Sequence, residues 1–334
     1  MSNAESPPLL TPARLAEYRA RYAERIAPLA DPVLTEHRKA FRTALPASLL
    51  GLAGLVAVGW MFITTDWSSD RWWSDRDTLV RLALVAGIAT GAIALSAWLV
   101  RPSANRQRDA EERFRRQVLP AAFSTLRPGA RYEPTVALGE KWMRRSALVR
   151  SGNRYESGHE VRWRMQDLTC RLAHVSAELH RHTRDSSVTT VHFQGEVGVV
   201  DLPESAGGYV RVRARRHRFE PAPEATNLAP VDASPLGLGD DYEVHTSSPA
   251  LAAAVLTPRL SALLGDVTRA RYGIHLAVAH QELFVAVEQS PPWFDGLVNR
   301  FDEDHFLQMA ETMDIVDGFA TEVVAGLRSA RASG

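Results

Sequence analysis

The stretch ALPASLLGLAGLVAVGWMFIT, from Ala44 to Thr64, contains no charged residue and decides how the rest of the chain is interpreted. A second uncharged run, LALVAGIATGAIALSAWLV, extends from Leu82 to Val100. About 20 apolar residues in a helix cover the roughly 30 Å hydrocarbon core of a bilayer, and both runs fit this length. The first run lies too far along the chain, and is too long, for a cleaved signal peptide. The sequence therefore predicts a transmembrane hairpin over 44–100, with spans at 44–64 and 82–100.

The charges beside the two runs predict how the hairpin is oriented. The linker between them carries Arg71 and Arg76 among several aspartates. The outer flanks are richer in basic residues, namely Arg38, Lys39, Arg42, Arg101, Arg106, Arg108, Arg113, Arg115 and Arg116. Because basic flanks stay on the cytoplasmic side, we expect both termini in the cytoplasm and the linker outside. This predicts a multi-pass protein of the bacterial inner membrane, with the lipid bilayer as a partner.

A GxxxG pair, Gly87 and Gly91, lies within the second run. Small residues at this spacing let two membrane helices approach closely. We expect the pair to pack the two spans of one hairpin together. Packing between two copies is the alternative, so a homo-oligomer stays open.

Helices are expected on both sides of the hairpin. Thr11-Pro12 is a typical helix start, with threonine as the cap and proline at the first helical position. An apolar stripe follows, and we expect the helix to break at Asp31-Pro32. After the second span, the charged segment 105–119 predicts another helix. We assign 1–43 to a cytoplasmic N-terminal helix and 101–129 to a cytoplasmic helical stalk.

From 130 to 330 the pattern changes to strands and helices. Stretches rich in β-branched residues, LTCRLAHVSAELH from Leu168 and VTTVHFQGEVGVV from Val188, predict strands. A hairpin is expected about His280-Gln281, and the last helix carries an apolar stripe that we expect to cover the sheet. Short connections favour antiparallel pairing. The predicted fold class is α+β: a two-helix transmembrane hairpin with a helical stalk, then a mainly antiparallel β-sheet domain flanked by helices.

The stretch YVRVRARR, from Tyr209 to Arg216, alternates between apolar and basic residues. Strict alternation predicts a half-buried strand, here with a basic outer face. Such a face suits contact with anionic lipid or with an acidic protein partner. The candidate contact residues are Arg211, Arg213, Arg215 and Arg216. A solvated strand face without a partner is the alternative.

The stretch YEVHTSSPALAAAVLTP, from Tyr242 to Pro258, contains two helix starts close together. Ser248 precedes Pro249, and Thr257 precedes Pro258, so each pair predicts a capped helix. We therefore expect a strand followed by a corner between two short helices, with Thr257 acting as a cap rather than a nucleophile.

The sequence offers no recognisable catalytic, metal-binding or cofactor-binding motif. His180 and His182 do not make a zinc site, which needs three or four ligands. GxSxG elbows and phosphate-cradling glycine loops are absent. A formal net charge of zero provides no field that would attract nucleic acid. We therefore expect no cofactor and no nucleic-acid partner, and we lean toward a protein without enzymatic activity.

Three stretches together resemble the bacterial domain-of-unknown-function family 3137. They are FQGEVGVVDLP from Phe193, DYEVHTSSPALAAAVLTPRLSALL from Asp241 and IHLAVAHQELFVAVEQ from Ile274. The most specific part is Leu256, Thr257 and Pro258, whereas Glu196 and Val197 depart from the more hydrophobic or aromatic residues of the family. The resemblance implies two N-terminal spans, an inner-membrane location and a cytoplasmic α/β domain. It implies no activity and no catalytic residues.

The function predicted from these features is a membrane-anchored protein of unassigned activity. Its cytoplasmic domain is expected to act as a protein-interaction or regulatory scaffold, with a protein partner that the sequence does not identify. A membrane-tethered hydrolase and an anionic-lipid-sensing module are the two alternatives.

Overall fold

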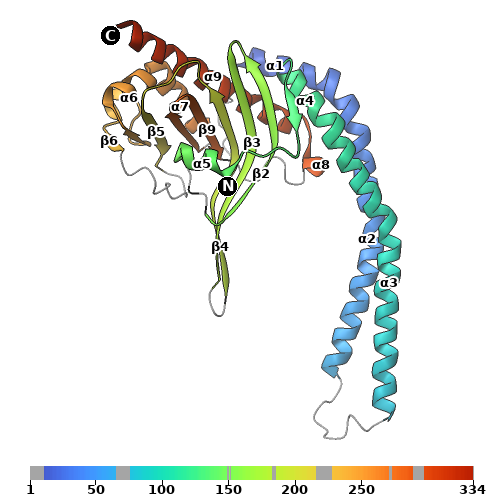
Figure 1. Ribbon diagram of the computed structural model, residues 1–334. Helices are drawn as coiled ribbons and strands as arrows, with labels where there is room; N and C mark the ends of the chain where they lie inside the picture. Colours follow the sequence, from blue (N-terminus) through green and yellow to red (C-terminus); the bar gives the residue numbers. More distant parts are fainter. Residues whose placement is uncertain are drawn as a thin grey trace. The chain divides into compact units, whose positions relative to one another are not determined.

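The computed structural model describes residues 11–64, 76–148, 150, 152–182, 186–215, 228–270, 273–288 and 297–333. It divides the chain into two compact units. One unit contains the chain up to Ala27 and from Leu119 onward, and the other contains Pro28–Val118. The first unit is an α+β domain built on a large antiparallel sheet, and the second is a helical hairpin (Figure 1). The predicted fold class is confirmed at this level.

Two long helices run antiparallel in the hairpin unit. They are α2 (Ala27–Thr64) and α3 (Arg76–Arg113), followed by the π-helical turn η2 (Phe114–Val118). Three contacts fix their pairing. Glu36 forms an ion pair with Arg113, and Thr43 Oγ1 lies 3.1 Å from Ser103 Oγ. Nearer the linker, a Cβ added at Gly51 would lie 2.7 Å from the hydroxyl oxygen of Ser96.

Two expectations about this hairpin are wrong. The helix does not break at Asp31-Pro32, because α2 continues through Pro32 and Pro46. Proline in a helix interior removes one backbone hydrogen bond, at a cost of about 3 kcal/mol, and the buried neighbours Val33 and Leu34 offset that cost by packing. Nor do Gly87 and Gly91 face the paired helix, since a Cβ added at either meets no atom within 4 Å. Gly51 allows the close approach instead.

The N-terminal helix of the α+β unit starts where the sequence predicts. In α1 (Pro12–Arg21) the Thr11 side chain accepts a hydrogen bond from the Arg14 amide at 3.4 Å. The π-helical turn η1 (Tyr22–Ile26) follows, and α4 (Leu119–Leu126) brings the chain back to the same unit. The ring of Tyr22 packs against that of Phe306 of the α+β unit, with 5.5 Å between the ring centroids. Of the expected apolar stripe, Tyr18, Tyr22 and Ile26 are buried, whereas Leu29 is exposed.

Nine strands of the described chain form one sheet in the order β1-β2-β3-β4-β9-β8-β5-β7-β6, with every neighbouring pair antiparallel. The predicted hairpin about His280 is confirmed, with Ala279 opposite Glu282. The strands are β1 (Arg131–Glu133), β2 (Arg154–Met165), β3 (Leu168–His182), β4 (Ser187–Asp201), β5 (Tyr209–Ala214), β6 (Ala229–Val231), β7 (Tyr242–Thr246), β8 (Ile274–Ala279) and β9 (Glu282–Glu288).

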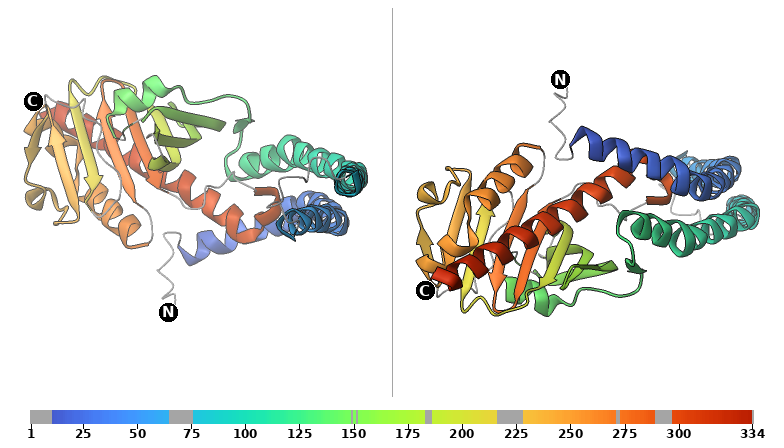
Figure 2. Two further views of the ribbon diagram at one scale, coloured as in Figure 1. Left: turned by 90° about the horizontal axis from the view of Figure 1, so that it is seen from below. Right: turned by 90° about the horizontal axis from the view of Figure 1, so that it is seen from above.

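Helices cover both faces of the sheet. On one face lies α9 (Glu303–Ser333), which Figure 2 shows crossing the strands, and a Cβ added at Gly198 of β4 would lie 2.8 Å from Val316 of this helix. The prediction that the last helix covers the sheet is confirmed. On the other face, Met143 of α5 (Glu140–Ser146) joins a buried cluster with Phe193 and Phe284. Two short elements, η3 (Ser234–Leu236) and α8 (Leu297–Arg300), complete the unit.

The predicted helix corner is present. In α6 (Pro249–Val255) the Ser248 side chain accepts a hydrogen bond from the Leu251 amide, and in α7 (Pro258–Ala270) Thr257 Oγ1 accepts one from the Leu260 amide at 3.2 Å. In a search confined to the described residues, no single helix combines the length and hydropathy of a membrane span; α6 and α7, bent by 69°, meet that requirement only as a pair.

Candidate functional site

Exposed large apolar side chains are concentrated on the α2–α3 hairpin. Trp60 and Ile63 of α2 are 70% and 81% exposed, and Trp98 of α3 is 69% exposed. The same surface includes Leu45, Leu49, Leu52, Leu55, Val56, Val80, Ile93, Leu95 and Leu99. Large continuous apolar surfaces on a protein mark contact with a membrane or with another protein. This surface is therefore the first candidate for function.

Farther from the linker, exposed apolar side chains become sparser, with Phe41 and Leu29 on α2. Away from the linker, α2 and α3 carry ionic side chains that pair across the two helices. Glu36 binds Arg113, and His37 Nε2 lies 3.7 Å from Glu111 Oε1. The hairpin thus changes from charged to apolar along its length, which the uncharged runs in the sequence predict.

In the α+β unit, only two large apolar side chains of the described residues are exposed. They are Val188, 53% exposed, and Val191, 42% exposed, and both belong to β4. Both valines lie near the start of β4, in the part of the strand that extends beyond the covered area of the sheet. This part of β4 is the second candidate, and the sequence alone predicts the strand but not the exposure.

The arginine-rich strand does not present the basic outer face that alternation predicts. Arg211 is only 6% exposed, and its Nη1 donates a hydrogen bond to the Ala147 carbonyl oxygen at 3.2 Å. Burial under this segment lowers the pKa of Arg211. Arg213 lies 3.7 Å from Glu243, Arg215 is exposed, and Arg216 is outside the described residues. The expectation is wrong for Arg211, because the segment that follows α5 covers this face of the sheet.

Neighbouring strands place further ionisable side chains beside these arginines. Directly opposed residues share a face, which puts His245 of β7 beside Arg211 and His275 of β8 beside Arg213. His275 Nε2 lies 3.8 Å from Glu288 Oε1 of β9. Burial, and then the charge of Arg211, lower the pKa of His245. The row therefore places side chains of four neighbouring strands, β7, β5, β8 and β9, side by side on one face of the sheet.

A second imidazole–carboxylate pair lies on the opposite face of the sheet. His174 of β3 stands opposite Glu196 of β4, with Nδ1 3.4 Å from Oε1. Glu196 is fully buried, on the face that α9 covers. Glu196 is therefore part of a buried polar pair inside the fold, remote from any substrate in solution.

His180 and His182 lie near the end of β3, with their ring centroids 4.5 Å apart. Within the part of the chain that the structure describes, no group of three or more His, Cys, Asp or Glu side chains is placed to hold a metal ion. Cys170 is buried, and burial raises the pKa of its thiol to about 12. Because the thiolate is the reactive form, this cysteine is inert at neutral pH.

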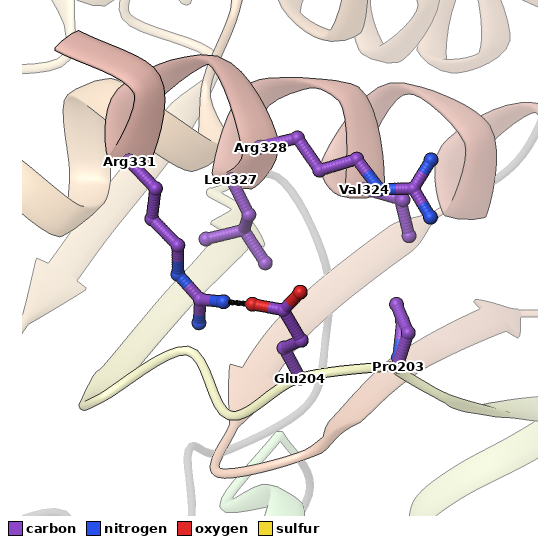
Figure 3. Close-up of a pocket in the computed structure, with 6 residues that line it drawn as sticks. All are labelled: Pro203, Glu204, Val324, Leu327, Arg328 and Arg331. Atoms are coloured by element: carbon purple, nitrogen blue, oxygen red, sulfur yellow. Dashed lines mark ion pairs between the residues drawn. The ribbon is translucent and has the colours of Figure 1, made fainter.

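A shallow pocket lies between α9 and the segment after β4 (Figure 3). Its lining comprises Pro203, Glu204, Val324, Leu327, Arg328 and Arg331. Glu204 and Arg331 form an ion pair at its mouth, and both side chains are about half exposed to solvent. Exposed ion pairs of this kind contribute about 0–1 kcal/mol to the free energy of unfolding. The Arg331 guanidinium is already paired with the Glu204 carboxylate. Two of the pocket's three charged lining residues, Glu204 and Arg331, are thus already paired with each other.

The most extensive buried ionic network was not predicted from the sequence. Arg127, after α4, places Nε 2.6 Å from Asp317 Oδ2 and also pairs with Asp314, both on α9. Trp163 of β2 donates its indole N–H to Asp317 at 2.8 Å, and the Tyr18 hydroxyl of α1 donates to Asp314 at 3.2 Å. The network joins α1, β2 and α9 to the segment after α4, which favours a structural role.

The charges in this network depend on each other. Burial raises the pKa of Asp317, although Arg127 acts against that shift. Burial also opposes the charge on Arg127, but Asp317 and Asp314 raise its pKa above the ordinary value. The guanidinium is thus held between two carboxylates inside the protein, and removal of any one partner would leave an uncompensated charge.

Comparison with known proteins adds little to this description. No family model matches the chain, and no curated protein matches it. Among solved structures, the crystal structure of the mycobacterial trehalose monomycolate transport factor A, TtfA, has a TM-score of 0.37 and 12% sequence identity, covering 60% of this chain and 89% of that chain. The class that the fold itself defines is an α+β sheet domain carrying a helical hairpin.

Proposed function

We propose that this chain is a membrane-anchored scaffold at the bacterial inner membrane. The α2–α3 hairpin is the anchor, and the α+β domain presents a protein-binding surface in the cytoplasm. The observation that carries the proposal is the row of exposed apolar side chains along both helices, with Trp60, Ile63 and Trp98 the most exposed. Leaving one such side chain in water forgoes about 1.5–3 kcal/mol of burial, and hydrocarbon removes this cost for the whole row.

The orientation rests on charge. The basic residues on the outer flanks, among them Arg38, Lys39 and Arg101, favour a cytoplasmic location for both ends of the hairpin. The absence of acidic, lysine and histidine residues from both uncharged runs favours an anchor over an ion path.

A binding role has more support than a hydrolase. The described histidines are dispersed: His174 lies on the α9 face, His245 and His275 lie on the α5 face, and His180 lies near the end of β3. A lipid-sensing role for the arginine strand also has little support, because Arg211 is buried. The exposed Val188 and Val191 instead favour a protein contact.

Membrane extraction and cysteine labelling test the anchor. In a Cys170→Ser background, Ser69→Cys should react with an impermeant maleimide added to intact cells. Ala332→Cys, the matched control, should react only after the cells are permeabilised. The protein should stay in the membrane pellet after alkaline carbonate. Release by carbonate, or labelling of Ala332→Cys from outside, would contradict the proposal.

A further inference from the structure

The ends of β3 and β4 leave the main sheet as a two-stranded ribbon (Figure 1). Pairing of β2 with β3 ends at Arg154 opposite Glu178, and pairing of β9 with β4 ends at Glu288 opposite Gly195. Beyond these points, among the described residues, β3 and β4 pair only with each other up to His182 opposite Ser187. An isolated two-stranded hairpin is marginally stable in water, so such a ribbon gains from a further strand.

One edge of the ribbon is already closed. Asn153 lies beside β3, where its Oδ1 accepts the His180 amide at 2.7 Å and its Nδ2 donates to the His180 carbonyl oxygen at 2.7 Å. Gly152 allows this approach, because its φ is +67° and an added Cβ would lie 2.1 Å from the Glu178 carbonyl oxygen. The side-chain amide thus takes the place of a neighbouring strand on the β3 side.

Within the described chain, the β4 edge has no side-chain amide of this kind along Ser187–Val191. From Ser187 to Val191 the sequence is SVTTV, with no charge and no proline. Natural edge strands avoid pairing with other chains by carrying lysine, proline or bulges. The segment Ser187–Val191 has neither lysine nor proline, and the bulge in the pairing of β4 with β3 lies just beyond it, between Val191 and Phe193. Val188 and Val191 point to opposite faces of the ribbon, since they are three residues apart in a strand. A partner on one face would bury only one of them, whereas a strand along the edge contacts both.

We propose that the β4 edge pairs antiparallel with the same edge of a second copy of this chain. A two-fold arrangement centred on Thr189 places the two Thr189 side chains together, Val188 opposite Thr190, and Ser187 opposite Val191 of the second copy. Every such pair is uncharged, and threonine pairs and β-branched pairs stabilise neighbouring strands. The surface is therefore complementary to itself, as an isologous interface requires. In the four-stranded sheet that results, each valine gains a cross-strand neighbour on its own face.

This pairing goes beyond the proposed anchor and does not depend on it. Association through the ribbon is expected whether the hairpin is in a bilayer or in detergent. The test must therefore separate a dimer formed by the ribbon from one formed by the hairpin.

The experiment uses the full chain, purified in detergent, with its mass measured by light scattering over a range of concentrations. The chain should be a dimer, and Val188→Lys with Val191→Lys should weaken association at least tenfold by placing lysines at the interface. Val188→Thr with Val191→Thr, which keeps β-branched side chains, should remain a dimer. Both positions are exposed, so circular dichroism should report the same fold and melting temperature for each variant.

A disulfide cross-link tests the proposed pairing of the two β4 edges. In the Cys170→Ser background, Thr189→Cys should form an intermolecular disulfide under mild oxidation, whereas Arg164→Cys, exposed on β2, should not. A monomeric chain at every concentration overturns the proposal. So does a dimer that the lysine pair leaves unchanged, since it would form elsewhere. Binding of a foreign strand to a monomeric chain, lost in the lysine variant, also overturns it.

Discussion

Arg127 stabilises two carboxylates that would otherwise be expensive to bury. Its guanidinium contacts both Asp314 and Asp317, and the indole N–H of Trp163 donates a further hydrogen bond to Asp317. Replacing buried pairs with apolar residues is often neutral, but removing one partner leaves an uncompensated charge. The side chain at 127 therefore matters less for its own burial than for the two acids on α9.

Arg127→Met should lower the free energy of unfolding by about 3–5 kcal/mol, measured in urea by circular dichroism of the detergent-purified chain. Burial already raises the pKa of Asp317, and loss of the guanidinium raises it further. A carboxyl with a raised folded-state pKa stabilises the fold when protonated, so the deficit should shrink as pH falls through that pKa. Arg14→Met is the control: it removes an exposed partner of Asp314 and should cost less than about 1 kcal/mol. A pH-independent deficit would contradict this account.

Gly326 decides how closely α9 approaches the corner between α6 and α7. A Cβ at this position would lie 2.1 Å from the Ala254 carbonyl oxygen and 2.8 Å from Thr257 Cγ2. Glycine to alanine normally stabilises a helix interior by about 1 kcal/mol. Here we expect Gly326→Ala to destabilise by about 1–3 kcal/mol through overpacking, measured as a lower melting temperature. Gly318→Ala on the same helix, which meets only the end of Leu263 at 3.2 Å, should have a smaller effect.

At the scale of elements, the sequence predicts those features that depend only on residues close together in the chain. The caps at Thr11, Ser248 and Thr257 are where threonine-proline and serine-proline pairs indicate, because capping needs only neighbouring residues. The break at Pro32 is wrong because packing from distant residues sustains the helix. The basic face at Arg211 is wrong because alternation gives a strand two faces but does not say what covers each. Sequence reasoning cannot find the Arg127 network, whose members come from α1, β2, α9 and the segment after α4.

The corner itself provides the prediction at this scale. Thr257→Ala should cost about 1 kcal/mol, because the Leu260 amide loses its acceptor. Thr257→Ser should keep most of that energy, since serine supplies the same oxygen. The measurement is the free energy of unfolding of both variants in urea. Equal losses in the two variants would mean that the methyl group packed beneath Gly326, rather than the cap, is what threonine contributes.

At the scale of the whole molecule, the hairpin is an insertion into a domain that closes without it. The chain before Ala27 and the chain after Leu119 belong to one compact unit. Arg21 Nη1 donates to the Thr125 carbonyl oxygen at 3.2 Å, and Tyr22 packs against Phe306 of α9. These contacts hold the two points where the hairpin would be removed. We therefore expect the folding of the α+β unit to be separable from the proposed anchoring by the hairpin.

Replacing Pro28–Val118 with a short Gly/Ser linker should give a chain that leaves the membrane and folds. We expect the shortened chain in the soluble fraction without detergent, with a sheet-rich circular dichroism spectrum and one cooperative thermal transition. Adding Arg127→Met to it should lower the midpoint, because the same network joins α1 and α9 there. A shortened chain that still sediments with membranes would place the anchor outside the hairpin. One that aggregates while the full chain is folded in detergent would mean that residues 28–118 are needed for folding, because the contacts of Arg21 and Tyr22 do not close the domain on their own.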